Sequence, residues 1–219
     1  MKTSLIVAAH LDDVELGMGG TVLKIKDEDS SHRICVVMVC KGDVPNRVNN
    51  DHEKRWKTFN KNMSDMGIEH IYNLDMPSNR LEVVNKNNII NDLDNIIDDT
   101  QPDTIYTHNR YDINQDHRIV SEAVRVVARP RVSCPVTSLL EFPITGSTEW
   151  NGEAFLPNTV YDVSKYHTDK LKYFRRYDTE IRPSPDPMSV DKIKARDSYY
   201  GSIYGMKYAE VFKLIFKKL

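Results

Sequence analysis

Short apolar runs alternate along the chain with longer segments in which apolar residues recur every three or four positions. The short runs are rich in β-branched residues and have the length of buried strands. The longer segments have the spacing of helices with one apolar face. The predicted strands are Ser4–Ala9, Ile34–Cys40, Ile71–Leu74, Thr104–Thr107, Val136–Glu141 and Thr159–Val163.

The predicted helices lie between these strands and after the last one. Gly17, Gly19 and Gly20 are expected to open the first helix. Gly67 and Pro130 follow two later helices, at positions where these residue types commonly end a helix. The predicted helices run from Gly17 to about Asp27 and over Asp51–Met66, Asn87–Asp99, His117–Ala128, Lys165–Tyr177 and Val190–Tyr200.

The alternation of strands and helices predicts the fold class. It is typical of an α/β fold, here a Rossmann-like, mostly parallel sheet with helices on both faces, joined by right-handed crossovers. A length of 219 residues fits a single domain spanning residues 1–219. Ligands bind such open sheets beyond the carboxyl ends of the strands. Polar residues that directly follow a strand are therefore the first candidates for a functional site.

Composition and charge exclude several other classes of protein. The 30 basic and 32 acidic residues give a net charge of −2, which argues against binding nucleic acid through bulk charge. The apolar stretch Leu5–Ala9 is too short for a signal peptide or an integral membrane segment, so we expect a cytoplasmic protein. The 3 cysteines show no CxxC spacing and suggest neither disulfides nor a thiolate zinc site; Cys35 and Cys40 are expected to be small buried thiols.

The first candidate site directly follows the first predicted strand. In the segment AAHLDDVELGMGG, the residues His10, Asp12, Asp13 and Glu15 stand within six positions of one another. Imidazole and carboxylate are zinc ligands, and a neighbouring carboxylate left off the metal can act on water. The alternative is that Asp12 or Asp13 only caps the following helix. The sequence GMGG does not fit GxGxxG, so dinucleotide binding is not supported.

The second candidate site follows the strand at Thr104–Thr107. In the segment THNRYDINQDHRIV, His117 would supply a second imidazole, and a parallel sheet would place it beside the first segment. Asp112 or Asp116 would orient that imidazole through its second nitrogen. The alternative is a surface loop in which Asp116 caps the next helix.

Together these two segments resemble the motifs of the LmbE-like, or PIG-L, family of metal-dependent N-acetylglucosamine deacetylases, which read A-H-P-D-D and D-H. The resemblance extends in family order through GMGGTV, Arg55, Tyr161–Val163 and Gly205–Phe212, and so covers nearly the whole chain. The sequence departs from the family pattern at three positions. Leu11 replaces the usual proline, Asn114 stands where some members carry a histidine, and Thr58 stands where relatives often have glutamate.

The resemblance implies a ligand set and a catalytic residue. His10, Asp13 and His117 would bind zinc or another divalent transition metal, and Asp12 would be the general base. The residue chemistry alone leaves open which of the two adjacent aspartates is the ligand.

The resemblance also implies substrate contacts. Arg55 matches a position that contacts substrate hydroxyls or a phosphate in relatives. Asn114 stands where some members carry a histidine that assists the carbonyl oxygen, and His108 is a second candidate for that role.

The function implied is a zinc-dependent hydrolase that removes the N-acetyl group from an N-acetylglucosamine-type amino sugar, giving a free amine and acetate. Its partner would be a small-molecule N-acetylated sugar or sugar conjugate, and the sequence is compatible with a homo-oligomer. One alternative keeps the metal site but acts on another N-acyl or carbamoyl amine; another is a non-catalytic sugar- or nucleotide-binding module. Specificity is expected in three loops, and pyrophosphate recognition would need clustered arginines. The loops are Val44–Asp51, Pro143–Leu156 and Ile181–Met188, and the arginines are Arg175, Arg176 and Arg182.

Overall fold

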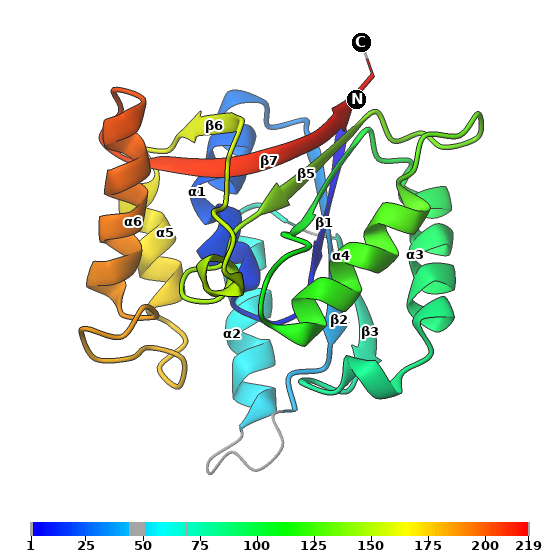
Figure 1. Cartoon of the computed structure of the whole chain (residues 1–219), viewed down its shortest axis with the longest axis horizontal. Helices are drawn as coiled ribbons and strands as arrows, with labels where there is room; N and C mark the ends of the chain where they lie inside the picture. Colours follow the sequence, from blue (N-terminus) through cyan, green and yellow to red (C-terminus); the bar gives the residue numbers. More distant parts are fainter. Residues whose placement is uncertain (1, 44–50, 69, 219) are drawn as a thin grey trace.

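A seven-stranded sheet forms the centre of the molecule (Figure 1). The computed structural model describes residues 2–43, 51–68 and 70–218, and within these ranges six α-helices pack around the sheet. The strands are β1 (Thr3–Ala8), β2 (Arg33–Cys40), β3 (His70–Met76), β4 (Thr104–His108), β5 (Ser138–Phe142), β6 (Thr159–Asp162) and β7 (Ala209–Lys217). The helices are α1 (Asp13–Glu28), α2 (His52–Asp65), α3 (Lys86–Thr100), α4 (Gln115–Val127), α5 (His167–Phe174) and α6 (Val190–Ile203), with short 3₁₀ turns η1 (Leu81–Val83) and η2 (Thr148–Asn151).

The order of the strands confirms the predicted fold class. The sheet runs β3-β2-β1-β4-β5-β7-β6, and the first five strands in this order pair in parallel. Strand β7 is antiparallel to both of its neighbours. The chain leaves β1 toward β2 on one side and later returns to β4 on the other. This reversal makes the carboxyl ends of β1 and β4 the switch point at which ligands bind α/β sheets.

Helices cover both faces of the sheet, as predicted. All six residues of β1 are buried, as expected for a central parallel strand. Ile6 and Ala8 belong to the apolar cluster beneath α1, α2, α5 and α6, whereas Leu5 and Val7 belong to the cluster beneath α3 and α4. Figure 1 shows these two groups of helices on opposite sides of the sheet. The edge at which β1 and β4 end is thus enclosed from both faces.

The start of α1 differs from the prediction. We expected Gly17, Gly19 and Gly20 to open this helix, but it begins at Asp13, and all three glycines lie buried inside it. The backbone leaves the helical region at Met18 (φ −153°, ψ 21°), where glycines on both sides allow a kink. The helix begins earlier because the turn at His10–Asp13 already closes its first hydrogen bonds.

The glycines of α1 instead permit close packing against other elements. A Cβ atom on Gly20 would lie 2.8 Å from Cβ of Val163, the residue after β6. A Cβ atom on Gly17 would overlap the ring of Phe142 at the end of β5. At Gly19 the nearest atom would be Cγ of Lys170 at 3.4 Å, an ordinary contact. Gly17 and Gly20 therefore fix how closely α1 approaches the sheet.

Strand β7 was not among the predicted strands. Its sequence AEVFKLIFK places charged residues among apolar ones and lacks an apolar run like that of β2. Its Glu210 is buried and accepts hydrogen bonds from the N–H groups of Gly20 and Thr21 at 2.9 and 2.6 Å. The other predicted elements are present, with ends that differ by at most three residues.

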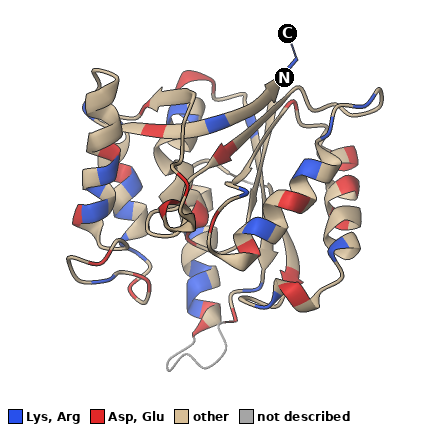
Figure 2. Cartoon of the chain, in the orientation of Figure 1, with Lys and Arg blue, Asp and Glu red and all other residues tan. Residues whose placement is uncertain are grey.

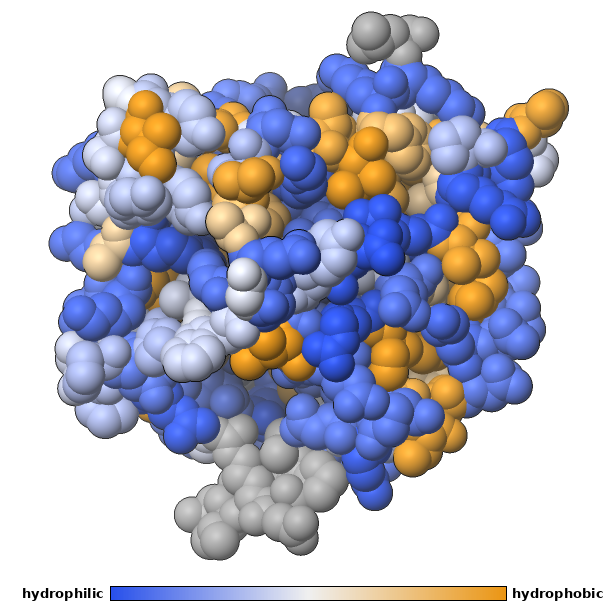
Figure 3. Space-filling model, in the orientation of Figure 1, coloured by the Kyte–Doolittle hydropathy of each residue, from blue (hydrophilic) through white to orange (hydrophobic). Residues whose placement is uncertain are grey.

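The surface agrees with the balanced composition. Acidic and basic residues are interspersed over the helices and loops (Figure 2). On the face shown in Figure 3, apolar residues form separate groups among hydrophilic ones. Among the described residues, no helix combines the length and the apolar character that crossing a membrane requires.

Replacing Gly20 by alanine tests the packing of α1. We expect Gly20→Ala to lower the free energy of unfolding by about 1–3 kcal/mol relative to Gly19→Ala, because only the former overpacks the contact with Val163. Both variants gain the same helix propensity, so their difference isolates the packing effect. Chemical denaturation of both variants measures it, and equal stabilities would contradict the close approach.

Candidate active site

The two segments identified in the sequence meet at the switch point. His10 lies in the turn between β1 and α1, and His117 lies in the first turn of α4, which follows β4. Nδ1 of His10 and Nε2 of His117 are 3.1 Å apart. Oδ2 of Asp13 lies 3.6 Å from the first of these atoms, and Oδ1 of Asp13 lies 3.5 Å from the second. Three donor residues thus converge from two segments that are 107 residues apart.

Hydrogen bonds within the first turn fix Asp13. Its Oδ2 accepts the His10 N–H at 2.6 Å, and its own N–H donates to the His10 carbonyl at 3.2 Å. Asp12 occupies the N-cap position of α1, but its side chain makes no capping hydrogen bond. The alternative that Asp12 merely caps α1 is therefore wrong.

A second carboxylate orients His10. Nε2 of His10 lies 2.9 Å from Oδ2 of Asp116, in the first turn of α4. Asp116 is itself held by the N–H groups of Asn79 at 2.6 Å and Leu81 at 3.2 Å. The capping residue of α4 is Asn114, whose Oδ1 accepts the Asp116 N–H at 2.9 Å. Asp116 is thus free of the capping role that we considered, and it fixes the imidazole of His10.

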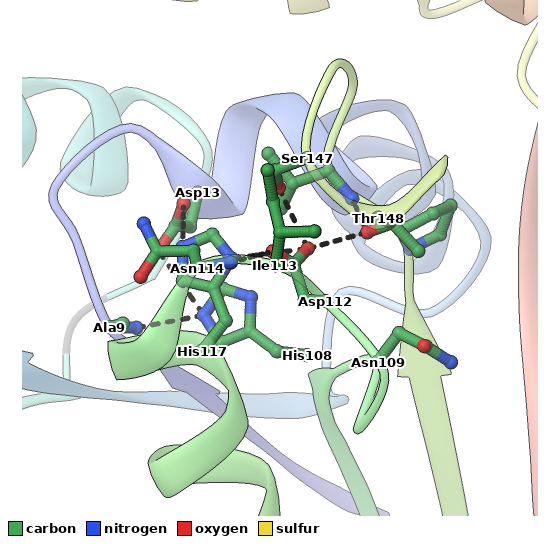
Figure 4. A network of polar contacts seen from close by, with 12 residues as sticks. Ala9, Asp13, His108, Asn109, Asp112, Ile113, Asn114, His117, Ser147 and Thr148 are labelled. Carbon is green, nitrogen blue, oxygen red and sulfur yellow. Dashed lines mark hydrogen bonds and ion pairs between the residues drawn. The ribbon is translucent and has the colours of Figure 1, made fainter. Parts of the chain in front are cut away.

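His117 has a carboxylate at its second nitrogen as well. Nδ1 of His117 lies 3.3 Å from Oδ2 of Asp112. The same oxygen accepts the hydroxyl groups of Ser147 at 2.8 Å and Thr148 at 2.6 Å. Figure 4 shows these two residues reaching Asp112 from the loop after β5. Asp112 therefore links His117 to that loop.

Burial and charge set the ionisation of this cluster. Burial alone would raise the pKa of Asp13, but His117 and His108 outweigh it and hold that pKa well below its ordinary value. Burial would lower the pKa of His117, but the carboxylates of Asp13 and Asp112 raise it to about 10. The cluster therefore has a strong preference for positive charge between its carboxylates.

A cavity of about 740 Å³ opens beside these donors. Its walls include His10, Asp12, Asp13, Asn114 and His117. Burial, followed by the negative charges of Asp13 and Glu180, raises the pKa of Asp12 to about 7. A carboxylate in this state accepts a proton near neutral pH.

Arg55 also lines the cavity, and its guanidinium is already engaged. Its Nη1 lies 3.0 Å from Oε1 of Glu180, and its Nη2 donates to the Gly42 carbonyl. Sequence reasoning did not single out Glu180. It lies 125 positions from Arg55 in a loop without a motif, so no local pattern marks it.

His108 does not occupy the position expected of it. Its side chain is fully buried and stacks on His117, with ring centroids 3.9 Å apart and an 8° angle between the planes. Its Nε2 accepts the Ala9 N–H at 2.9 Å and lies 3.2 Å from Asp13 Oδ2. His108 is not among the residues that line the cavity. It packs behind His117 and Asp13 and does not face a bound substrate.

Glu15, the last acidic residue of the first motif, points away from the donors. Its Oε1 lies 2.7 Å from Nδ2 of Asn62 and 2.9 Å from the Tyr177 hydroxyl. Burial raises the pKa of Glu15 to about 8. Glu15 thus connects α1 to α2 and to the segment after α5.

The loops expected to set specificity contribute unequally. Residues 44–50 of the first loop lie outside the described residues. Ile144–Ser147 of the second loop and Arg182 and Asp186–Met188 of the third line the cavity. The arginine cluster considered for pyrophosphate is absent from the cavity walls, because Arg176 pairs with Asp65 at 2.7 Å and only Arg182 of the three faces the cavity.

Comparisons with known proteins agree with this fold. The chain resembles a conserved protein of Thermus thermophilus, with 23% identity, a TM-score of 0.78 and coverage of 100% of this chain and 97% of that one. It also resembles the N,N'-diacetylchitobiose deacetylase of Pyrococcus horikoshii, with 21% identity, a TM-score of 0.75 and coverage of 98% and 84%. A third similar structure is the 4-carboxy-2-hydroxymuconate hydratase of Pseudomonas putida, with 15% identity, a TM-score of 0.75 and coverage of 100% and 98%. One fold thus carries different reactions.

A family model identifies the chain more specifically. The model for PIG-L, described as GlcNAc-PI de-N-acetylase, matches residues 5–128. This range includes most of β1, all of β4 and both segments that supply the converging donors. The chain belongs to the PIG-L family.

Proposed function

We propose that this protein is a zinc-dependent amidohydrolase that removes the acetyl group from an N-acetylated amino sugar. The observation that carries the proposal is the convergence of His10 Nδ1, Asp13 and His117 Nε2 on the wall of a cavity that Asp12 also lines. The family description and the chitobiose deacetylase among the similar structures support an N-acetylated sugar as substrate.

The donor set fits zinc. Tetrahedral zinc with bonds of about 2.0–2.2 Å needs donor atoms separated by roughly 3.3–3.6 Å. Here the two nitrogens are 3.1 Å apart, Asp13 Oδ2 is 3.6 Å from His10 Nδ1, and Asp13 Oδ1 is 3.5 Å from His117 Nε2. Each imidazole also has a carboxylate at its other nitrogen, an arrangement typical of histidines that bind zinc. Other divalent transition metals accept the same nitrogen and oxygen donors.

Charge favours a cation at the same place. Asp13, Asp112 and Asp116 are nearly inaccessible to solvent and surround the two imidazoles. Buried carboxylates need compensating positive charge, because their removal from water is costly. A divalent ion would supply that charge and displace the proton that His117 holds in its absence.

Asp12 is the proposed general base. When bound, zinc would polarise the acyl carbonyl and lower the pKa of a nearby water. Asp12 would take a proton from the attacking water as its oxygen bonds to the acyl carbon. It would then give that proton to the nitrogen as the carbon–nitrogen bond breaks, leaving acetate and the free amine. A pKa near 7 suits both steps.

Three further residues of the cavity wall would bind the sugar. Asn114 would donate its amide N–H to the carbonyl, because its Oδ1 already accepts the Asp116 N–H. Arg55, held by Glu180, would donate to sugar hydroxyls. Arg182 would meet parts of the substrate farther from the metal.

A panel of N-acetylated sugars tests the proposed function. We expect acetate release from at least one of them, loss of release with a chelator, and recovery when zinc is added back. An enzyme for another N-acyl or carbamoyl amine would leave this panel intact and would release amine only when those compounds are supplied instead. A binding module would bind sugars in the presence of chelator and release no acetate. That result would refute the proposal that the protein is an enzyme.

Replacing Asp12 by asparagine separates base catalysis from metal binding. We expect Asp12→Asn to retain one zinc per chain and to lose about 10²–10⁴-fold in kcat, because the amide cannot accept the proton. Metal analysis and acetate release on the same sample measure both effects. Turnover close to that of the parent protein would rule out this role.

Replacing His117 by alanine tests the ligand set. We expect His117→Ala to lose zinc during dialysis, because the site then retains one imidazole and one carboxylate. His70→Ala is the matched control, because His70 lies exposed on β3 and should retain zinc. Equal zinc content in the two variants would refute His117 as a ligand.

A further inference from the structure

A second set of donor atoms lies on the opposite side of the His10 ring. His10 Nε2, Cys40 Sγ and Asp116 Oδ2 all lie within 4.8 Å of one another. Cys40 is the last residue of β2, next to β1, so its thiol also lies at the carboxyl edge of the sheet. Its Sγ is 3.6 Å from Asp116 Oδ2, and His10 Nε2 is 2.9 Å from the same oxygen.

Cys40 is not an isolated thiol, because it lies in a buried cluster with two other metal-binding side chains. The Cys40 side chain is fully buried, and Asp116 is 1% exposed. The Asp116 carboxylate also accepts the N–H groups of Asn79 and Leu81, which hold it in place independently of the other two donors. Sulfur, imidazole nitrogen and carboxylate oxygen together are a typical zinc donor set.

Two side-chain hydrogens of this cluster point to Asp116 Oδ2, which also accepts the Asn79 N–H. The Cys40 S–H donates to Asp116 Oδ2, and the His10 Nε2–H points to the same atom when Nδ1 faces the first set of donors. A divalent ion in their place would form bonds to sulfur, nitrogen and oxygen and release both protons to solvent. Two positive charges would leave and two would enter, so the buried cluster would keep its net charge.

We propose that His10, Cys40 and Asp116 form a second, inhibitory zinc site that shares His10 with the catalytic one. The first ion binds Nδ1 of the ring and the second binds Nε2. Occupation of Nε2 replaces the hydrogen bond to Asp116 that orients the ring, and it places a second divalent charge across the ring from the first ion, which repels that ion. The first ion is then held less well. Of the three residues, His10 also lines the cavity beside the first site.

Cobalt titration tests the second site without any substrate. Protein loaded with one zinc per chain is titrated with Co²⁺, because a thiolate bound to Co²⁺ gives an intense charge-transfer absorption that nitrogen and oxygen ligands do not give. We expect this absorption to rise and saturate at one added Co²⁺ per chain, with the zinc retained. It should be absent in Cys40→Ser.

The matched control is Cys35→Ser, because Cys35 is an equally buried thiol on the same strand that belongs to no donor group among the described residues. This variant should show the same absorption as the parent protein. Absence of the absorption in the parent protein, or its persistence in Cys40→Ser, would overturn the second site.

Inhibition of acetate release tests whether zinc at the second site inhibits the enzyme, an inference that rests on the proposed function. Excess zinc should inhibit the parent protein and Cys35→Ser at the same concentration, whereas Cys40→Ser should need at least about tenfold more for the same fractional loss of its own rate. Equal sensitivity of all three would refute inhibition through Cys40. A protein that shows the cobalt absorption but releases no acetate would contradict the proposed function and leave the second site intact.

Discussion

Buried negative charge at the carboxyl edge of the sheet is the constraint on which the site depends. Asp13, Asp112 and Asp116 lie almost out of solvent, and each contacts an imidazole of His10 or His117. Backbone N–H groups and hydroxyls donate to the Asp112 and Asp116 carboxylates, in part to the same oxygens that face the imidazoles. This arrangement favours a cation there, and it orders the loops that supply those hydrogen bonds.

The packing of α1 fixes the position of the first motif relative to the second. Buried Glu210 on β7 accepts from the N–H groups of Gly20 and Thr21 in α1. Lys170 on α5 lies 2.8 Å from the same carboxylate and 2.7 Å from Asp197 on α6. Contacts from β7, α5 and α6 therefore hold α1 in place. Because α1 begins at Asp13, they also fix the position of this candidate ligand. This explains how residues far from the cavity contribute to its geometry.

Sequence patterns predicted the parts of the fold that depend on local periodicity. The parallel strands and the amphipathic helices follow from apolar spacing, and the two His-Asp segments follow from their position after strands. The role of the α1 glycines could not be predicted, because it depends on side chains from β5 and after β6. Strand β7 was missed because Glu210 and Lys213 stand among its apolar residues, and buried Glu210 finds its partners only in the folded chain.

The candidate site divides in the same way. His10, Asp12, Asp13 and His117 were found because the motif places them next to strand ends. The contact of Arg55 with Glu180 and the contact of Cys40 with Asp116 were not found, because each joins segments at least 76 positions apart. His108 was misplaced for a related reason. Its position after a strand suggested the cavity, but its ring stacks behind His117.

X-ray absorption at the zinc edge of protein loaded with one zinc per chain tests the central claim most directly. The account predicts nitrogen and oxygen neighbours only, with outer-shell scattering from two imidazole rings, as His10, Asp13 and His117 require. Sulfur in the first shell would place the first ion at Cys40, and a protein that retains no zinc would lack the site. Either result would contradict the assignment.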